Sequence, residues 1–270
     1  MSLGVLNNIS AIYAENNLNQ TQGSLQKTLQ QLSSGSRINS GADDAAGLSL
    51  ANGLQASASA LSQSAKNAAE GVDFLQVADG ALSQVTSLLN RAVTLGTEAS
   101  NGVLNSNQAT AADAEYQQIL TEIGNIDTNT EYNGINVFSA AANIFTSDGT
   151  LTQTNSATAL GSVVTAAGLA GTDLTSVANA TTALGKITTA IGAIASERGT
   201  AGAQINTLQA VSNVMSTEST NTLSATNDVT ATDYGMATSD MSKYQILMQT
   251  GVAALAQANS SQQLVTKLLQ

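Results

Sequence analysis

Apolar residues near both ends of the chain recur at the spacing of a helix. Leu18, Leu25, Leu29 and Leu32 follow one another at steps of seven, four and three, which is typical of a seam between two coiled helices. The other end of the chain repeats the pattern at Met241, Tyr244, Met248, Gly251, Leu255, Ala258, Gln262, Val265 and Leu269. The spacing therefore predicts one seam-forming helix near each end.

A long helix is predicted to follow the first seam. Ser and Gly at 33–36 and 40–41 interrupt the pattern before it. Asp43 and Asp44 favour a helix start, because acidic side chains complement the positive end of the helix dipole. We expect this helix to end near 101–102. Its candidate core positions are Leu54, Leu61, Leu75, Leu82, Val85, Leu89 and Leu95.

Two further helices are predicted from the same periodicity. The first covers about 109–128 and places Tyr116, Ile119, Ile123 and Ile126 on one face. The second has a long seam at Leu184, Ile187, Ile191, Ile194, Arg198, Ala201, Ile205, Leu208, Ser212 and Met215. Thr, Ser and Asn then dilute the pattern over 216–232.

The middle of the chain changes character. Asn133 and Gly134 form a turn dipeptide, and residues 135–138 alternate as a half-buried strand does. Residues 143–152 read as a β-hairpin whose turn holds Asp148 and Gly149. Residues 153–178 are weakly patterned.

The expected fold is mainly α. It is an elongated antiparallel helical coiled-coil bundle formed by the N- and C-terminal segments, with a small β-hairpin region in the middle. We expect residues 1–40 with 233–270 to form a terminal coiled-coil domain and 41–140 with 181–232 to form a helical rod domain that includes the β-hairpin. Residues 141–180 are expected to be a short variable surface segment.

Composition narrows the chemistry. The chain has 270 residues and no Pro, Cys, His or Trp, so nothing forbids long helices, and Ser-His-Asp triads, cysteine nucleophiles and His/Cys zinc sites are excluded. The residue types present do not exclude a hydrolase that uses only carboxylates, or a metal site with only oxygen ligands. No carboxylate pair is isolated in an apolar stretch, so we expect no catalytic residues, no metal and no cofactor.

Charge and hydropathy bear on partners. The net charge is −11 and the eight basic residues are scattered, so they form no patch that could neutralise a run of phosphates, and we expect no nucleic-acid partner. No apolar run approaches the roughly 18 residues of a membrane helix, and the N-terminus lacks the pattern of a cleaved leader. Charged residues make up only 10%, a composition that allows the surface to lie close against copies of itself.

Sequence motifs at both ends resemble the bacterial flagellin family. The N-terminal motif comprises Asn16–Asn19, Leu32–Ser40 and Asp43–Gly47, and the C-terminal motif comprises Met241–Leu247 and Leu255–Asn259. The resemblance covers about 1–140 and 185–270. Two long motifs in the correct order at opposite ends of the chain are specific for this family, whereas a match to one short motif would be weak evidence.

The resemblance implies a structural subunit that self-assembles into the extracellular flagellar filament. Implied partners are copies of the chain, the flagellar cap and hook-junction proteins, an export chaperone and the type III export apparatus. Members of this family are exported unfolded, and their terminal segments order on assembly. The alternative is a hook-filament junction protein, which shares terminal helices. An enzyme or carbohydrate-binding module within 141–180 is disfavoured, because about 40 Ser/Thr/Ala-rich residues offer little core.

Subunit contacts are expected along both terminal motifs. Asp43 or Asp44 either starts a helix or pairs with Arg37 or a neighbouring subunit. The full expected interface set is Leu18, Leu25, Leu29, Leu32, Arg37, Ile38, Asp43, Asp44, Met241, Gln245, Ile246, Leu255, Gln257, Asn259, Leu268 and Leu269.

A second surface is implied by the resemblance alone. Arg91, Leu95 and Glu115 match residues that the flagellin-sensing Toll-like receptor of vertebrates reads in some flagellins. Val93 and Thr94 stand where an Arg and a Glu are usual, which favours weak or absent activation. The plainer interpretation is a contact face between subunits.

Overall fold

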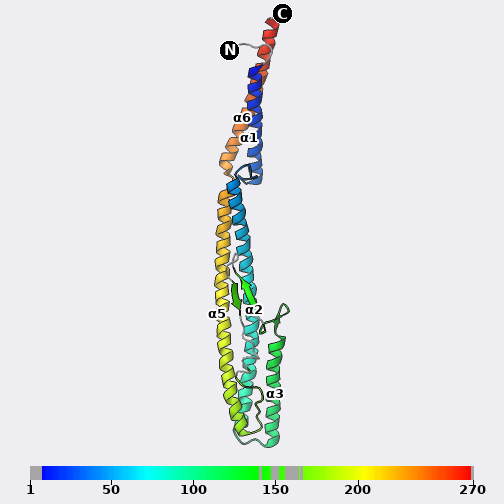
Figure 1. Ribbon diagram of the computed structural model, residues 1–270, viewed down its shortest axis with the longest axis vertical. Helices are drawn as coiled ribbons and strands as arrows, with labels where there is room; N and C mark the ends of the chain where they lie inside the picture. Colours follow the sequence, from blue (N-terminus) through cyan, green and yellow to red (C-terminus); the bar gives the residue numbers. More distant parts are fainter. Residues whose placement is uncertain (1–7, 140–141, 147–151, 156–163, 165–166, 269–270) are drawn as a thin grey trace. The chain divides into compact units, whose positions relative to one another are not determined.

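The structure, a computed structural model, describes residues 8–139, 142–146, 152–155, 164 and 167–268. Its helices are α1 (Ile9–Ser34), α2 (Ala45–Ser100), α3 (Ser106–Asn129), α5 (Val177–Thr230) and α6 (Tyr234–Leu268) (Figure 1). The mainly helical fold class with small β elements is confirmed. Helix α5 continues through 216–230, where Thr, Ser and Asn dilute the apolar pattern.

The chain divides into two compact units. Unit 1 comprises Met1–Ala56 and Thr222–Gln270, and unit 2 comprises Ser57–Asn221. Helices α2 and α5 each contribute residues to both units. The sequence predicted three parts, namely a terminal coiled-coil domain, a helical rod domain and a surface segment. These two units do not test that division, so it stays a prediction.

In unit 1, α1 and α6 run antiparallel and side by side (Figure 1). At one end, the Asn8 side-chain amide donates to the carbonyl of Ala258 at 3.0 Å. At the other end, the backbone N–H of Thr232 donates to the carbonyl of Gly35 at 3.0 Å. The termini of the two helices are therefore tied at opposite ends of one pair.

The positions through which α1 and α6 face each other, the seam, are mostly half-buried. The α6 seam follows the predicted spacing at Met241, Tyr244, Met248, Gly251, Leu255, Ala258 and Gln262. The α1 seam lies at Ala11, Ala14, Leu18, Thr21, Leu25, Thr28 and Leu32. The prediction for Leu29 is wrong, because Thr28 is 6% exposed and takes the seam position, whereas Leu29 is 44% exposed. A seam that alternates steps of three and four from Ala11 onward reaches position 28 rather than 29.

A short loop connects α1 to α2. Gly35 ends α1 in the left-handed conformation (φ 70°), which a glycine adopts without steric cost. Ser36 forms an isolated antiparallel β-bridge with Ala231. Asp44 caps α2, because its carboxylate accepts from the N–H of Gly47 at 2.8 Å. We call residues 35–44 with 229–233 the elbow.

In unit 2, α2 and α5 also run antiparallel. Ser219 and Ser212 of α5 donate to the carbonyls of Ala58 and Ala65, at 2.9 and 3.2 Å. Further along the pair, Arg198 and Asp79 form an ion pair at 2.7 Å. The predicted α5 seam from Leu184 to Met215 is buried or half-buried at every position, so it is confirmed.

Helix α3 completes the core of unit 2. A capping box of Asn105 and Gln108 starts the helix. Its predicted face is buried at Tyr116, Ile119 and Ile123, and Ile126 is half-buried. The Tyr116 hydroxyl lies 2.6 Å from the Thr172 hydroxyl, so a connecting loop packs over the helix.

The strands form two small antiparallel hairpins. β1 (Glu131–Tyr132) pairs with β2 (Ile135–Asn136), and β3 (Ala142–Phe145) pairs with β4 (Thr152–Asn155). The expected hairpin turn at Asp148 and Gly149 lies outside the described residues.

The strand predicted over 135–138 forms only at Ile135–Asn136, and the predicted alternation of buried and exposed side chains is wrong. Ile135 is 51% exposed, whereas Val137 and Phe138 are both buried. The side-chain oxygen of Asn136 accepts from the N–H groups of Phe138 and Ser139, both at 2.8 Å. This local hydrogen bonding turns the chain, and a turn lets two consecutive side chains enter the core.

Candidate assembly surfaces

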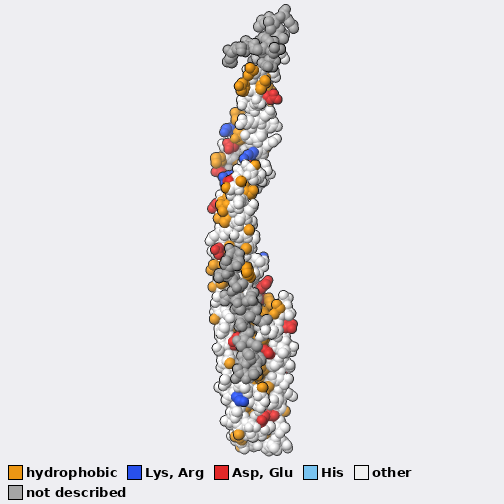
Figure 2. Space-filling view, in the orientation of Figure 1, with side chains coloured by type: hydrophobic (Ala, Val, Ile, Leu, Met, Phe, Trp, Pro, Cys, Tyr) orange, Lys and Arg blue, Asp and Glu red, His pale blue; other side chains and the backbone are white. Residues whose placement is uncertain are grey.

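Unit 1 exposes many large apolar side chains. Ile9, Ile12 and Tyr13 of α1 are 60%, 52% and 67% exposed, and Ile246 of α6 is 60% exposed. Among the residues of unit 1 whose side chains the structure describes, the remaining exposed large apolar ones are Leu29, Leu50, Leu223, Tyr234, Met236, Leu247 and Val252. Figure 2 shows apolar side chains at the surface of this unit, interspersed with charged ones.

The most exposed of these residues on α1 lie opposite the seam. Ile9, Ile12 and Tyr13 are one helical face, because positions three and four apart in a helix are neighbours. Ile246 holds the corresponding place on α6, between the seam residues Tyr244 and Met248. We call Ile9, Ile12, Tyr13 and Ile246 the outward face; it comprises the two sides of the helix pair, one on α1 and one on α6, that point away from the seam. The single chain does not bury it.

Apart from Ile38, Asp43 and Asp44, which lie in the elbow, the expected interface residues with described side chains separate into two groups. Leu18, Leu25, Leu32, Met241 and Leu255 are half-buried in the seam of the same chain. Those that remain exposed are Leu29, Arg37, Gln245, Ile246, Gln257 and Asn259. Leu269 and the side chain of Leu268 lie outside the described residues.

Sequence reasoning missed Ile9, Ile12 and Tyr13. They fall outside the leucine spacing, so a search for one seam passes over them. The signal was present as three apolar residues within one and a half turns of α1, on the side away from Leu18.

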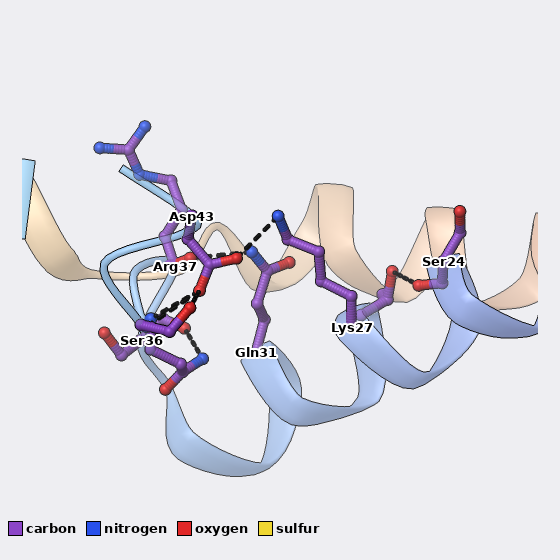
Figure 3. Close-up of polar contacts among 9 residues, drawn as sticks. Ser24, Lys27, Gln31, Ser36, Arg37 and Asp43 are labelled. Atoms are coloured by element: carbon purple, nitrogen blue, oxygen red, sulfur yellow. Dashed lines mark hydrogen bonds and ion pairs between the residues drawn. The ribbon is translucent and has the colours of Figure 1, made fainter. Parts of the chain in front are cut away.

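Asp43 organises the elbow (Figure 3). Its carboxylate accepts from Lys27 Nζ at 2.8 Å, from the N–H groups of Asn39 and Ser40, and from the Ser40 hydroxyl. The Lys27 hydrogen bond, followed by those of Ser40 and Asn39, lowers the pKa of Asp43 to about 2. The carboxylate therefore joins the last turns of α1 to the loop before α2.

The predicted pairing of Asp43 or Asp44 with Arg37 is wrong within the chain. The Arg37 guanidinium donates to the carbonyl of Val229 at 2.9 Å, and its backbone N–H donates to the carbonyl of Thr230 at 2.7 Å. The carbonyl of Arg37 accepts from Gln31 Nε2 at 2.9 Å (Figure 3). Ile38, which is 5% exposed, packs inside the elbow.

The residues of the expected receptor surface lie in unit 2. Arg91 Nε is 2.7 Å from Glu115 Oε1, and Arg91 Nη2 is 3.0 Å from Glu115 Oε2, so α2 and α3 are joined by a paired contact. The Arg91 hydrogen bond lowers the pKa of Glu115. Leu95 is 3% exposed and belongs to the core. The two charged side chains are therefore at the surface, and the leucine is not.

Two searches of the described residues bear on other kinds of site. None of the helices, over the part of each that the structure describes, is apolar enough along 18 residues to cross a bilayer. Within that same part of the chain, Asp and Glu residues do not gather into a group of three that could hold a metal ion.

Two segments that together cover most of the chain match helical regions of one family. Residues 5–143 match the bacterial flagellin N-terminal helical region, and residues 184–269 match the bacterial flagellin C-terminal helical region. Both matched regions are helical regions of a structural protein, which agrees with the mainly helical fold of this chain. The chain belongs to the bacterial flagellin family.

Individual relatives agree with this membership. The chain is 37% identical over 132 residues to flagellin 1 of Proteus mirabilis and to phase 1 flagellin of Salmonella naestved. That match covers 49% of this chain, 36% of the Proteus protein and 26% of the Salmonella protein. The chain thus spans well under half of the length of these relatives.

A solved structure is also similar. The crystal structure of Bacillus cereus flagellin superposes with a TM-score of 0.51 at 32% sequence identity. The superposition covers 60% of this chain and 94% of the Bacillus chain. The helical arrangement of the part that superposes is therefore shared with a flagellin of known structure.

Proposed function

We propose that this chain is a structural subunit that self-assembles into the bacterial flagellar filament. The observation that carries the proposal is the outward face, which the single chain leaves in water on the same unit that holds both terminal flagellin motifs. Its occupant is a second copy of the chain.

The energetic argument rests on the geometry of unit 1. Two helices cover only one stripe of each other, so apolar residues on the opposite side stay exposed. Fully burying a large apolar side chain stabilises by about 1.5–3 kcal/mol, and the outward face holds four of them. Contact between copies would bury this area repeatedly along a polymer.

The distribution of charge also supports unit 1 as the part that contacts other copies of the chain. Unit 1 contains four basic and six acidic residues, whereas unit 2 contains four basic and thirteen acidic residues. Close packing of like-charged surfaces is unfavourable, so the nearly neutral unit is the better one for intimate contact between copies.

The proposal extends to the finer roles that the family implies. These are an extracellular location, export through the type III apparatus with a chaperone, and contacts with cap and hook-junction proteins. We propose a structural role without catalysis. The hook-filament junction alternative has no observation in its favour, since both matched regions are those of flagellin.

Seeded polymerisation tests the proposal. Purified chain should add to filament seeds and give long filaments, seen by electron microscopy and by sedimentation. Tyr13→Ser and Ile246→Ser should each lower the sedimented fraction severalfold, because each removes an exposed apolar side chain without opening the seam. Thermal unfolding of unit 2 should stay unchanged in both variants.

Each of the two substitutions has a matched control at an exposed residue seven positions further along the same helix. Gln20 lies seven residues after Tyr13, Ala253 lies seven residues after Ile246, and both are exposed. Gln20→Ser and Ala253→Ser should polymerise like the unaltered chain. A stable monomer that never polymerises on seeds would refute the proposed function.

A further inference from the structure

The chain contains three Asn–Gly pairs, and each lies in a different kind of backbone. Asn52–Gly53 lies inside α2, Asn101–Gly102 directly follows α2, and Asn133–Gly134 forms the tip of the β1–β2 hairpin. An Asn that precedes Gly can lose its side-chain amide without an enzyme, because the next backbone nitrogen can attack the side-chain carbonyl carbon and glycine leaves its approach open. The backbone around each pair decides whether the nitrogen can reach that carbon.

Asn133 and Gly134 form a two-residue hairpin turn. Tyr132 pairs with Ile135 across β1 and β2, and φ is 51° at Asn133 and 75° at Gly134. Positive φ at both central residues is typical of a type I′ turn. Both residues are exposed, and a Cβ on Gly134 would meet no heavy atom of the described residues within 4 Å. The nitrogen of Gly134 therefore lies in open space.

This turn can adopt the geometry of a closed ring without loss of the hairpin. Rotation of the peptide unit between the two residues converts a type I′ turn into a type II′ turn, in which φ of the first residue stays at about +60° and its ψ changes from about +30° to about −120°. The five-membered succinimide ring that forms from asparagine holds ψ close to this second value. Both turn types connect the same paired strands, and glycine at the second position accepts the change in the sign of φ.

Both legs of the hairpin are anchored in unit 2. The rings of Tyr132 and Phe74 of α2 meet edge to face, with their centroids 6.2 Å apart. On the other leg, the Asn136 side-chain amide donates to the carbonyls of Asp127 and Thr128 at the end of α3, at 2.7 and 3.0 Å. The legs are thus fixed on two helices, and only the tip has to rotate.

The other two pairs lack this geometry. The backbone N–H of Asn101 donates to the carbonyl of Glu98 at 3.2 Å, so Asn101 extends the last turn of α2. A Cβ on Gly102 would lie 3.6 Å from Val177 of α5. A ψ of about −120°, as in a type II′ turn, would redirect the chain before the capped start of α3. Inside α2, the backbone N–H of Gly53 belongs to the helical hydrogen-bond ladder.

We propose that Asn133 is a self-modification site, which the hairpin turn converts to aspartate or isoaspartate. A bond forms between the nitrogen of Gly134 and Cγ of Asn133, and the Cγ–Nδ2 bond breaks. Nδ2 leaves as ammonia with the proton of the Gly134 nitrogen. Water then opens the ring, at Cγ to give aspartate or at the main-chain carbonyl carbon to give isoaspartate. Both products add one negative charge, and isoaspartate also adds one atom to the backbone of the turn.

Peptide mapping by mass spectrometry tests the proposal on purified full-length chain in mildly alkaline buffer. Cleavage after glutamate separates the two pairs of unit 2, because Glu115, Glu122 and Glu131 lie between them. In concentrated urea, Asn101 and Asn133 should react at similar rates, since both precede Gly. In the folded chain, Asn133 should keep the rate that it has in urea, whereas Asn101 should react at least tenfold more slowly than in urea.

Asn133→Gly is the matched control, because a Gly–Gly pair suits the same turn and carries no side-chain amide. Labelling by an isoaspartate-specific methyltransferase should fall at least tenfold in this variant, and the rate at Asn101 should stay unchanged. Slowing of Asn133 on folding as strong as that of Asn101, or full labelling in Asn133→Gly, would overturn the proposal. The reaction needs only unit 2, so failure of the chain to polymerise on seeds would overturn the proposed function and leave this site standing.

Discussion

The two units use the same helical periodicity and reach different depths of burial. In unit 2, α2, α3 and α5 surround a cluster in which Leu75, Leu82, Leu89, Ile187 and Leu208 have no exposed surface. In unit 1, the buried apolar residues among those described are Ile38, Ala51 and Ala237. The α1–α6 seam is otherwise half-buried.

The difference in burial comes from the number of helices and loops that pack against the apolar side of each helix. A third helix and a loop cover what α2 and α5 leave open in unit 2. Unit 1 has no such cover in the described part of the chain, so its periodic helices remain amphipathic without a closed core. Unit 2 therefore has a core of its own, whereas the proposed assembly would stabilise unit 1 through contacts with copies.

The largest expected effect comes from opening the core of unit 2. Leu82→Ala should lower the free energy of unfolding by about 2–5 kcal/mol, because it removes a fully buried side chain and leaves a cavity. Leu50→Ala on the same helix removes a side chain that is 55% exposed in unit 1, and it should change that energy by at most about 0.5 kcal/mol. Urea unfolding measures both. Equal losses would contradict the comparison.

Filling a tight space in unit 2 should cost less. A Cβ on Gly71 of α2 would collide with Ile144 of β3 and lie 3.1 Å from Leu208 of α5. Gly71→Ala should destabilise by about 1–3 kcal/mol, because Ile144 must leave its site against α2. Gly80→Ala, in open space on the same helix, should stabilise by about 0.4–1 kcal/mol. The same sign for both, in thermal unfolding, would refute this explanation.

Ion pairs of unit 2 should matter little beside its core. Asp79 and Arg198 are each 37% exposed, so a double-mutant cycle with Asp79→Asn and Arg198→Gln should give a coupling of at most about 1 kcal/mol. The coupling should fall further at high salt. A coupling as large as the loss in Leu82→Ala would show that charges, rather than packing, hold unit 2.

The smallest effect concerns pH and the elbow of unit 1. The pKa of Asp43 is lowered to about 2 from an ordinary value near 3.8, so its stabilising contacts are complete above about pH 4. They should be lost as pH falls from 4 through 2, because protonation removes the acceptor for Lys27. The amide protection factors of Asn39 and Ser40, which correct for the intrinsic pH dependence of exchange, should fall over that range, and Asp43→Asn should abolish this fall. A change centred near pH 4 or above would contradict the proposed network.

Sequence alone determined the helices and most of their inner faces. The steps of three and four along α5 and α6 lie on the buried or half-buried positions, because side-chain direction in a helix follows from local geometry. The flagellin motifs at both ends were equally visible. The start of α2 near Asp43 and Asp44 followed from the helix dipole, because acidic side chains are favoured at the positive end of a helix.

Tertiary structure decided what the periodicity left open. It placed Thr28 rather than Leu29 in the seam, paired Asp43 with Lys27, and turned Val137 and Phe138 together into the core. These outcomes depend on which element meets which stripe, and that partner is distant in sequence. For the same reason only the fold shows that Tyr13 and Ile246 stay uncovered, since exposure is a property of the neighbours that an element has.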